Sequence, residues 1–259
     1  MNVSEVEIAH RVQQFGAEKP LLRKIVGSDI TRKAYRLAQS SLRCYRDLTV
    51  PTGRFEWDST EELAGEAIRR GAMQKHSEFT GLLDMLNKQQ PSNVLEVGTA
   101  GGGTFFALAH IAVDHARLSS VDLPGGDFGG GYTPRGKKRI GSYVLPTQQL
   151  NLLQADSHDP DTHARVVDLL EDEPLDFLMI DGDHSREGVR QDWEMYAPLV
   201  RYGGMVAFHD VAPHEADPRC QVSGLWQDIK GSHNTLELIE PPTADGAGQW
   251  GGIGVVFVE

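Results

Sequence analysis

The stretch DFLMIDGDHSREG, at 176–188, ends an apolar run with two carboxylates and an imidazole, those of Asp181, Asp183 and His184. A carboxylate can bind a divalent cation, and a well-placed imidazole can accept a proton from a substrate. These residue types therefore favour metal binding or proton removal at the end of a buried strand. We expect Asp183 to shape the turn or to cap the next helix rather than to bind a ligand.

A second apolar run, GGMVAFHD at 203–210, ends in His209 and Asp210. If the two runs form neighbouring strands of a parallel sheet, Asp181 and Asp210 meet at its carboxyl edge, where such sheets bind ligands. Two carboxylates with water and substrate oxygens make the hard, oxygen-rich site that suits magnesium. An imidazole favours manganese, iron or zinc instead, so the identity of the metal and the role of His209 both stay open.

A glycine-rich stretch, VLEVGTAGGGT at 94–104, could bring its backbone close to a ligand. Glu96 lies at the end of the expected strand, and Gly98, Thr99 and Gly101 follow in the turn. Glycine permits both the tight strand-to-helix turn and a close approach of the ligand. The stretch is not the dinucleotide fingerprint GxGxxG, because alanine occupies the position of the second glycine.

Two further acids end the next two apolar runs. Asp122 follows LSSV, and Asp156 follows LLQA with Ser157 after it. At these places Asp122 could accept hydrogen bonds from both ribose hydroxyls of a nucleoside, and Asp156 with Ser157 could contact an adenine edge. Capping of the following helices is the alternative, because Asp and Ser are favoured N-cap residues.

The elements that must position these residues are short apolar runs that alternate with helical patterns from residue 91 onward. Such a succession indicates a parallel sheet covered on both faces. The last two runs, HNTLELIEP and WGGIGVVFVE, have no helical pattern between them and are expected to pair antiparallel. The predicted fold is an α/β, Rossmann-like sheet of seven strands, the last one antiparallel, with helices on both faces.

Residues 1–90 are predicted to form an N-terminal helical extension ahead of a ligand-binding domain over 91–259. Helical spacing of apolar residues runs through the extension, and Ser59 with Glu62 predicts a capping box. The glycine-dense stretch 123–141 contains four basic residues, and we expect it to be a mobile flap over the ligand.

The net charge of −12 argues against nucleic acid or an anionic membrane as a partner. No apolar run approaches the length of a membrane span, and the first residues lack the pattern of a signal peptide. The two cysteines, Cys44 and Cys220, have no CxxC spacing. These observations predict a cytoplasmic protein.

The glycine-rich stretch, the acid at Asp122 and the terminal hairpin make residues 91–259 resemble class I S-adenosylmethionine-dependent methyltransferases. The resemblance implies that S-adenosylmethionine is the cofactor and that 91–259 is its binding domain. The residues expected to bind it are Glu96, Gly98, Thr99, Gly101, Asp122, Asp156, Ser157 and Asp181.

The two acid-ended strands resemble a narrower family, the metal-dependent O-methyltransferases of macrolide sugars and their cephalosporin-hydroxylase-like relatives. This resemblance implies that Asp181, His209 and Asp210 hold a divalent metal and that His184 is the catalytic base. Magnesium is the expected metal, with manganese or another transition metal as the alternative. His209 departs from the family pattern, which has a carboxylate at that position.

The expected reaction is methyl transfer to a hydroxyl of a sugar or polyhydroxylated natural product. An alkyl hydroxyl is barely ionised near neutral pH, so the reaction needs a base or a metal. The expected partner is a small, glycosylated acceptor, and the expected assembly is a homo-oligomer with contacts through the extension. The alternative is a non-catalytic protein of the same fold that binds cofactor and assists another enzyme. A nicotinamide-dependent dehydrogenase is disfavoured by the broken fingerprint.

Overall fold

The structure is a computed structural model that describes residues 49–126, 128, 130–214, 217–241 and 249–259. The described strands are β1 (Asn93–Val97), β2 (Arg117–Val121), β3 (Gln149–Leu153), β4 (Leu175–Ile180), β5 (Val200–His209), β6 (Asn234–Leu238) and β7 (Ile253–Phe257). The described helices are α4 (Thr60–Arg69), α5 (His76–Gln89), α6 (Gly103–Ile111), α7 (Pro134–Gly141), α8 (Pro160–Leu170), α9 (Arg186–Tyr196), α10 (Val222–Lys230) and the short 3-10 helix η1 (Ala197–Leu199). The helices predicted before residue 49 lie outside the described residues.

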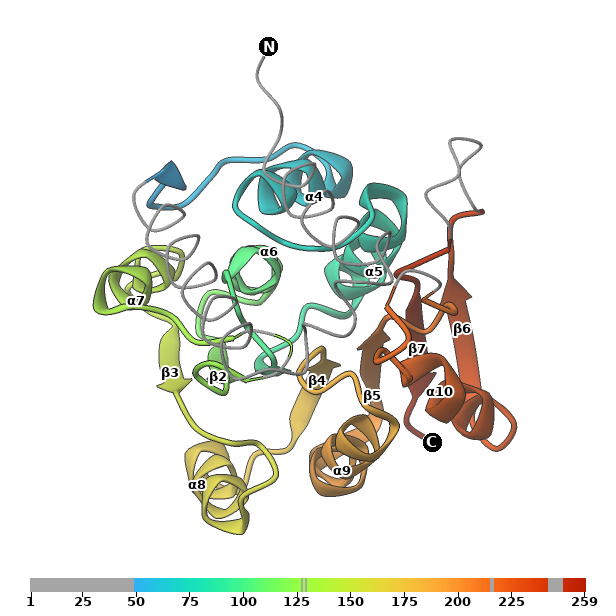
Figure 1. The fold of residues 1–259 in the computed structure, drawn as a ribbon. Helices are drawn as coiled ribbons and strands as arrows, with labels where there is room; N and C mark the ends of the chain where they lie inside the picture. Colours follow the sequence, from blue (N-terminus) through green and yellow to red (C-terminus); the bar gives the residue numbers. More distant parts are fainter. Residues whose placement is uncertain (1–48, 127, 129, 215–216, 242–248) are drawn as a thin grey trace, which may run out of the picture.

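The strands form one seven-stranded sheet in the order β3-β2-β1-β4-β5-β7-β6 (Figure 1). Strands β1 to β5 pair in parallel, and β7 pairs antiparallel with both β5 and β6. Strands β1 and β4 are buried at every position, as their unbroken apolar sequences predict. The predicted seven-stranded α/β sheet with an antiparallel last strand is confirmed.

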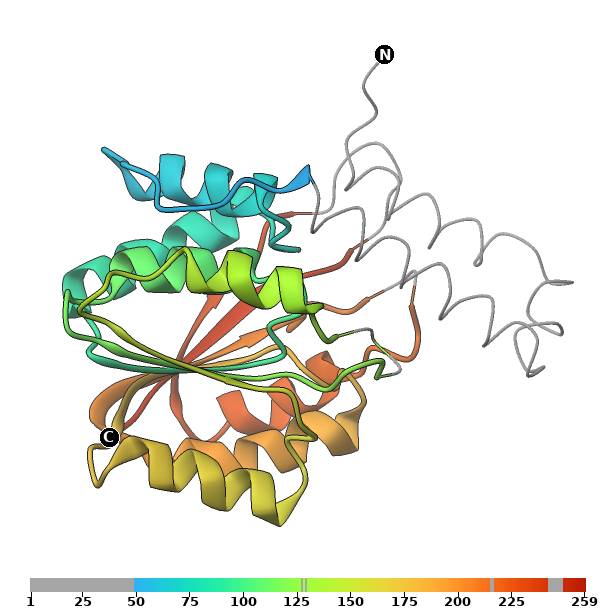
Figure 2. The ribbon, with the colours of Figure 1, turned by 90° about the vertical axis from the view of Figure 1, so that its left-hand side faces the viewer.

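Helices cover the sheet on both faces (Figure 2). Helices α5, α6 and α7 lie over one face, and α4 packs on the outside of α5 and α6. Helices α8, α9 and α10 lie over the other face. Each face has its own apolar core, one containing Phe79 and Phe105 and the other containing Tyr196 and Trp226. None of the helices in the described part of the chain is long and apolar enough to cross a membrane.

The helical pattern over 58–89 forms two helices, α4 and α5, joined by a short turn. Ser59 caps α4 as predicted, because its hydroxyl accepts the backbone N–H of Glu62 at 3.2 Å. Apolar residues of both helices belong to the core on their face of the sheet. The boundary at residue 90 stays a prediction.

The sequence predicts that the whole stretch 123–141 is a flap, but its last eight residues form helix α7. The hydroxyl of Thr133 accepts the backbone N–H of Gly136 at 3.1 Å, and Pro134 occupies the first turn. Arg139 is only 2% exposed, and its guanidinium donates to the carbonyl oxygen of Gly101 at 2.9 Å. The many glycines of this stretch favoured a loop in the sequence analysis, so the helix start at Thr133 and Pro134 was not recognised.

The turn after β1 depends on Gly98. Its φ is +93°, and a Cβ at this position would overlap the carbonyl oxygen of Asp181. The same junction includes a hydrogen bond from the backbone N–H of Asp181 to the carbonyl of Val97, 2.8 Å long. Glycine is therefore required for the end of β1 to lie against the end of β4.

We expect Gly98→Ala to lower the free energy of unfolding by roughly 3 kcal/mol or more, from the strained φ together with the overlap. Gly53→Ala is the matched control, because Gly53 has a similar φ of +86° but nothing within 4 Å of the added Cβ. The control should cost about 1 kcal/mol. Urea unfolding measures both values, and equal losses would show that the contact with Asp181 is unimportant.

His110 of α6 gives the fold a pH dependence. Its Nδ1 lies 2.7 Å from the carbonyl of Phe106, and its Nε2 is 3.0 Å from the backbone N–H of Phe55. An acceptor Nε2 requires the neutral ring. Burial lowers the pKa of His110 from 6.5 to about 4. The unfolded chain therefore takes up a proton between about pH 6.5 and 4 that the folded chain does not.

Stability from His110 is thus fully present above about pH 6.5 and is lost as the pH falls to about 4. The loss is on the order of 3 kcal/mol. In His110→Gln this contribution is absent, so wild type and variant should converge in stability as the pH falls. Unfolding free energies of both proteins from pH 7 to 4 provide the measurement, and carboxylates that titrate in this range cancel in the difference. A difference that does not change with pH would contradict the prediction.

Candidate active site

Two acids and two histidines converge where β4 and β5 end. The strands are neighbours, with Ile180 opposite Phe208, so the residues after them meet at one edge. The ring of His184 lies between the carboxylates, with Nε2 3.4 Å from Asp181 Oδ1 and Nδ1 3.1 Å from Asp210 Oδ2. The sequence prediction that these side chains lie together agrees with this geometry.

His209, the last residue of β5, lies against the same two carboxylates. Its Nδ1 lies 3.2 Å from Asp181 Oδ1 and 3.6 Å from Asp210 Oδ2. Its Nε2 is buried and has no hydrogen-bond partner among the described residues. Each carboxylate therefore faces two imidazoles.

The charges in this cluster determine one another. Burial lowers the pKa of His209, but the negative charges of Asp210 and Asp181 outweigh burial and raise that pKa to about 9. Burial likewise opposes the charge on His184, yet hydrogen bonds to Asp181 and Asp210 raise its pKa well above 6.5. The imidazoles in turn hold the pKa of both carboxyls below the usual range against the effect of burial. Two carboxylates and two imidazolium rings thus neutralise one another.

Residues from other elements complete the cluster, and sequence reasoning missed them. Gln74, in the turn between α4 and α5, is buried and donates from Nε2 to Asp181 Oδ2 at 3.1 Å. Phe128 stacks on the ring of His184, with centroids 4.8 Å apart. Cys220, just before α10, has its sulfur within 4.8 Å of a ring nitrogen of His184. Of these three residues only Cys220 stood out in the sequence, as one of two cysteines, and its spacing matched no known motif.

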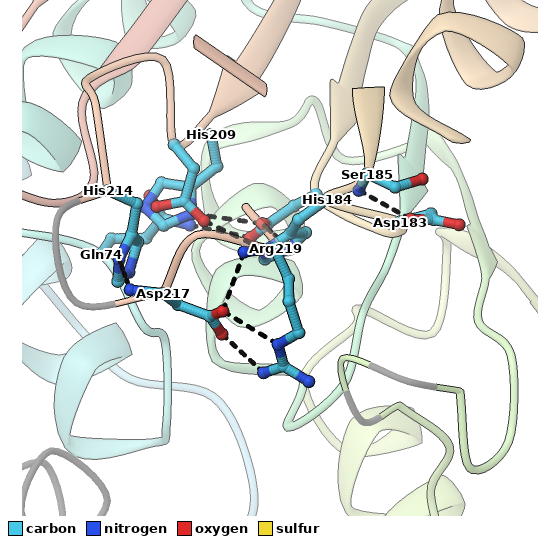
Figure 3. A network of polar contacts seen from close by, with 10 residues as sticks. Gln74, Asp183, His184, Ser185, His209, His214, Asp217 and Arg219 are labelled. Atoms are coloured by element: carbon cyan, nitrogen blue, oxygen red, sulfur yellow. Dashed lines mark hydrogen bonds and ion pairs between the residues drawn. The ribbon is translucent and has the colours of Figure 1, made fainter. Parts of the chain in front are cut away.

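Asp183 takes no part in the cluster. Its Oδ1 accepts the backbone N–H of Ser185 at 2.8 Å, and Ser185 is the N-cap of α9. In Figure 3 this pair points away from His184 and His209. The expectation that Asp183 shapes the turn agrees with this arrangement.

The glycine-rich turn places a buried acid beside the cluster. Glu96 is 1% exposed and hydrogen-bonds Thr99, while its Oε2 has no partner among the described residues. Burial raises the pKa of Glu96 well above its ordinary value, and the nearby Asp181 and Asp122 add to the effect. An unpartnered carboxyl oxygen suits a cationic group such as the ammonium of S-adenosylmethionine, so the residues fit this cofactor.

Asp122 lies at the end of β2 and links the two glycine-rich segments. Its Oδ1 accepts the backbone N–H of Ala100 at 3.1 Å, and its Oδ2 accepts that of Gly131. The Asp122 carboxylate therefore connects the turn after β1 with the loop after β2 through backbone N–H groups.

The two residues after β3 are less closely connected to the site. The Asp156 side chain is 52% exposed and accepts the backbone N–H of His158. Helix α8 is capped by Asp159, so Asp156 is not the N-cap that the sequence offered as its alternative role. The carbonyl of Ser157 accepts the Tyr196 hydroxyl at 2.7 Å. A cofactor role for Asp156 and Ser157 stays a prediction.

Residues 95–211 match the sequence profile of Methyltransf_24, described as a methyltransferase domain. The O-methyltransferase TomG from Streptomyces achromogenes, solved with S-adenosylmethionine, is 16% identical with a TM-score of 0.52, covering 85% of this chain and 96% of that chain. The methyltransferase MycE of the mycinamycin biosynthetic pathway, solved with Mg, S-adenosylhomocysteine and mycinamycin VI, is 17% identical with a TM-score of 0.51. That match covers 78% of this chain and 55% of the MycE chain.

The fold is therefore that of class I methyltransferases, as the resemblance predicts. The residues that match the methyltransferase domain extend from β1 to just past β5.

Substitution of Asp122 tests its predicted role in cofactor binding. In Asp122→Asn, one of the two backbone N–H groups faces an amide NH₂ and loses its acceptor, which loosens the glycine-rich turn. We expect S-adenosylhomocysteine to bind at least about 10-fold more weakly, as measured by calorimetry. The exposed Asp114→Asn is the matched control and should bind like wild type. Equal affinity in the two variants would refute the role.

Proposed function

We propose that the chain is an S-adenosylmethionine- and divalent-metal-dependent O-methyltransferase that acts on a hydroxyl of a sugar or polyhydroxylated natural product. The observation that carries the proposal is the His184 ring held between Asp181 and Asp210, beside the glycine-rich turn. A proton acceptor and a pair of anionic oxygens lie where the fold brings cofactor and acceptor together.

Asp181, His209 and Asp210 fit a divalent metal, because one ligand atom from each lies within 4.8 Å of the others. A bound cation would acidify the acceptor hydroxyl and would supply positive charge that the two imidazoles otherwise supply. Two oxygens and one nitrogen favour manganese or another transition metal over the magnesium that the family resemblance implies.

His184 is the proposed base for the hydroxyl proton. A base must be neutral before the reaction, and a cation held by Asp181, His209 and Asp210 would favour the neutral His184 ring by offsetting the charge of the carboxylates. The contact of Nδ1 with Asp210 Oδ2 would hold the resulting imidazolium, and Gln74 fixes Asp181 through its other oxygen. Phe128 stacks on the His184 ring and would shield that face of it from water.

The acceptor class rests on resemblance more than on contacts. MycE, a neighbour of the same fold, was solved with mycinamycin VI and Mg, which supports a small, glycosylated acceptor here. We also propose that the extension 1–90 completes the acceptor pocket, since Gln74 belongs to it and reaches Asp181. We further propose that the protein is cytoplasmic and homo-oligomeric and that it has no nucleic-acid or membrane partner.

His184→Gln should lower kcat at least about 100-fold, because the proton acceptor is lost. Binding of S-adenosylhomocysteine should change by less than about 2-fold, since the His184 ring contacts Asp181, Asp210 and Phe128 rather than the backbone of the glycine-rich turn. The exposed His115→Gln is the matched control and should keep wild-type kcat. Turnover is measured on a panel of hydroxylated and glycosylated acceptors.

Excess chelator should abolish turnover in the same assay, and added manganese should restore it. Full turnover in chelator would refute the metal dependence. Intact cofactor binding with no turnover on any acceptor would instead favour the non-catalytic alternative.

A further inference from the structure

A second set of metal-binding side chains overlaps the proposed centre. His184, Asp210 and Cys220 each offer one ligand atom, and these atoms lie within 4.8 Å of one another. The Nδ1 of His184 is 3.1 Å from Asp210 Oδ2. Ligand atoms of a tetrahedral zinc ion with bonds of about 2.0–2.3 Å lie roughly 3.3–3.8 Å apart. Small side-chain movements would therefore bring all three atoms around one ion.

The backbone holds Cys220 in this place. The N–H of Gln221 donates to the carbonyl of His184 at 2.7 Å, so the residue after the cysteine is tied to the histidine. The N–H of Cys220 itself donates to the carbonyl of Asp217 at 3.0 Å. Arg186, at the start of α9, forms an ion pair with Asp228 of α10 and links the two helices. The backbone of Cys220 is thus held next to that of His184, which keeps the thiol within reach of the imidazole.

The donor set differs in kind from that of the proposed catalytic metal. Sulfur, nitrogen and one carboxylate oxygen select zinc or cobalt over magnesium, which prefers oxygen ligands. Three protein ligands leave one coordination position for water, as in many zinc sites.

We propose that His184, Asp210 and Cys220 form a binding site for a thiophilic divalent metal, represented by Zn²⁺, and that its occupation inhibits methyl transfer. Binding would form Zn–S, Zn–N and Zn–O bonds and would release the thiol proton, with any proton on His184 Nδ1, to solvent. The ion would engage the imidazole of the proposed base and a carboxylate of the proposed catalytic metal site. The inhibition rests on the proposed function, whereas the binding does not.

Cobalt provides a spectroscopic test of binding on the untagged full chain without cofactor or acceptor. Cys44→Ser leaves Cys220 as the sole thiol. We expect one equivalent of Co²⁺ to give this variant a thiolate-to-cobalt charge-transfer absorption in the near ultraviolet, which Zn²⁺ then abolishes. Cys220→Ser should lack the absorption and should bind Zn²⁺ at least about 100-fold more weakly. No absorption in Cys44→Ser, or an undiminished one in Cys220→Ser, would overturn the site, and the first result does not depend on the folding of the second variant.

Inhibition is tested in manganese-supplemented turnover assays, with each protein compared with its own zinc-free rate. Wild type and Cys44→Ser should be inhibited by Zn²⁺ at concentrations near that of the enzyme, and Cys220→Ser should need at least about 100-fold more. Equal zinc sensitivity of all three proteins would overturn the inhibitory role. A cobalt absorption in a protein that never transfers methyl would refute the proposed function and leave the metal site standing. Methyl transfer by a protein that shows no cobalt absorption would support the proposed function and refute the metal site.

Discussion

Two carboxylates at the ends of neighbouring buried strands require positive charge between them. Strands β4 and β5 pair in parallel, so Asp181 and Asp210 are held close together, with Asp210 buried and the Asp181 side chain only 16% exposed. Like charges that cannot separate must be protonated or matched by cations. Here two histidine rings match them, and the same requirement makes the position attractive to a metal ion. The chemistry of the site follows from this one electrostatic demand.

The surrounding layers keep that arrangement from relaxing. Asp210 has a φ of +60°, which a residue with a side chain rarely adopts without support. The support comes from the start of β7, where the carbonyls of Gly252 and Gly251 accept the backbone N–H groups of Val211 and Ala212. Glu78 of α5 in turn accepts the N–H of Gly252 at 2.8 Å. A helix on one face of the sheet thus helps to fix the backbone that follows a reactive carboxylate.

Sequence alone predicted the parts that depend on periodicity and strand order. Unbroken apolar runs identify buried parallel strands, and the carboxyl ends of such strands share an edge, so the cluster of Asp181, His184 and Asp210 follows without coordinates. Gln74 could not be found in this way, because its contact depends on how a turn between two helices packs on α6. The start of α7 was hidden because glycines outnumbered the signals from Thr133 and Pro134. The position of Asp122 after its strand and the resemblance both predict a ribose contact, whereas its bonds to two backbone N–H groups depend on the path of the following loop.

The contact between Gly98 and the Asp181 carbonyl joins the glycine-rich turn, the proposed cofactor site, to the proposed acceptor end with no side chain between them. The two halves of the site are therefore not independent modules. Directed evolution that moves the end of β4 to admit a new acceptor would shift the turn that faces the cofactor as well. Changes of substrate range are better sought in elements that reach the cluster only through side chains, such as the turn that carries Gln74 or the segment around Phe128.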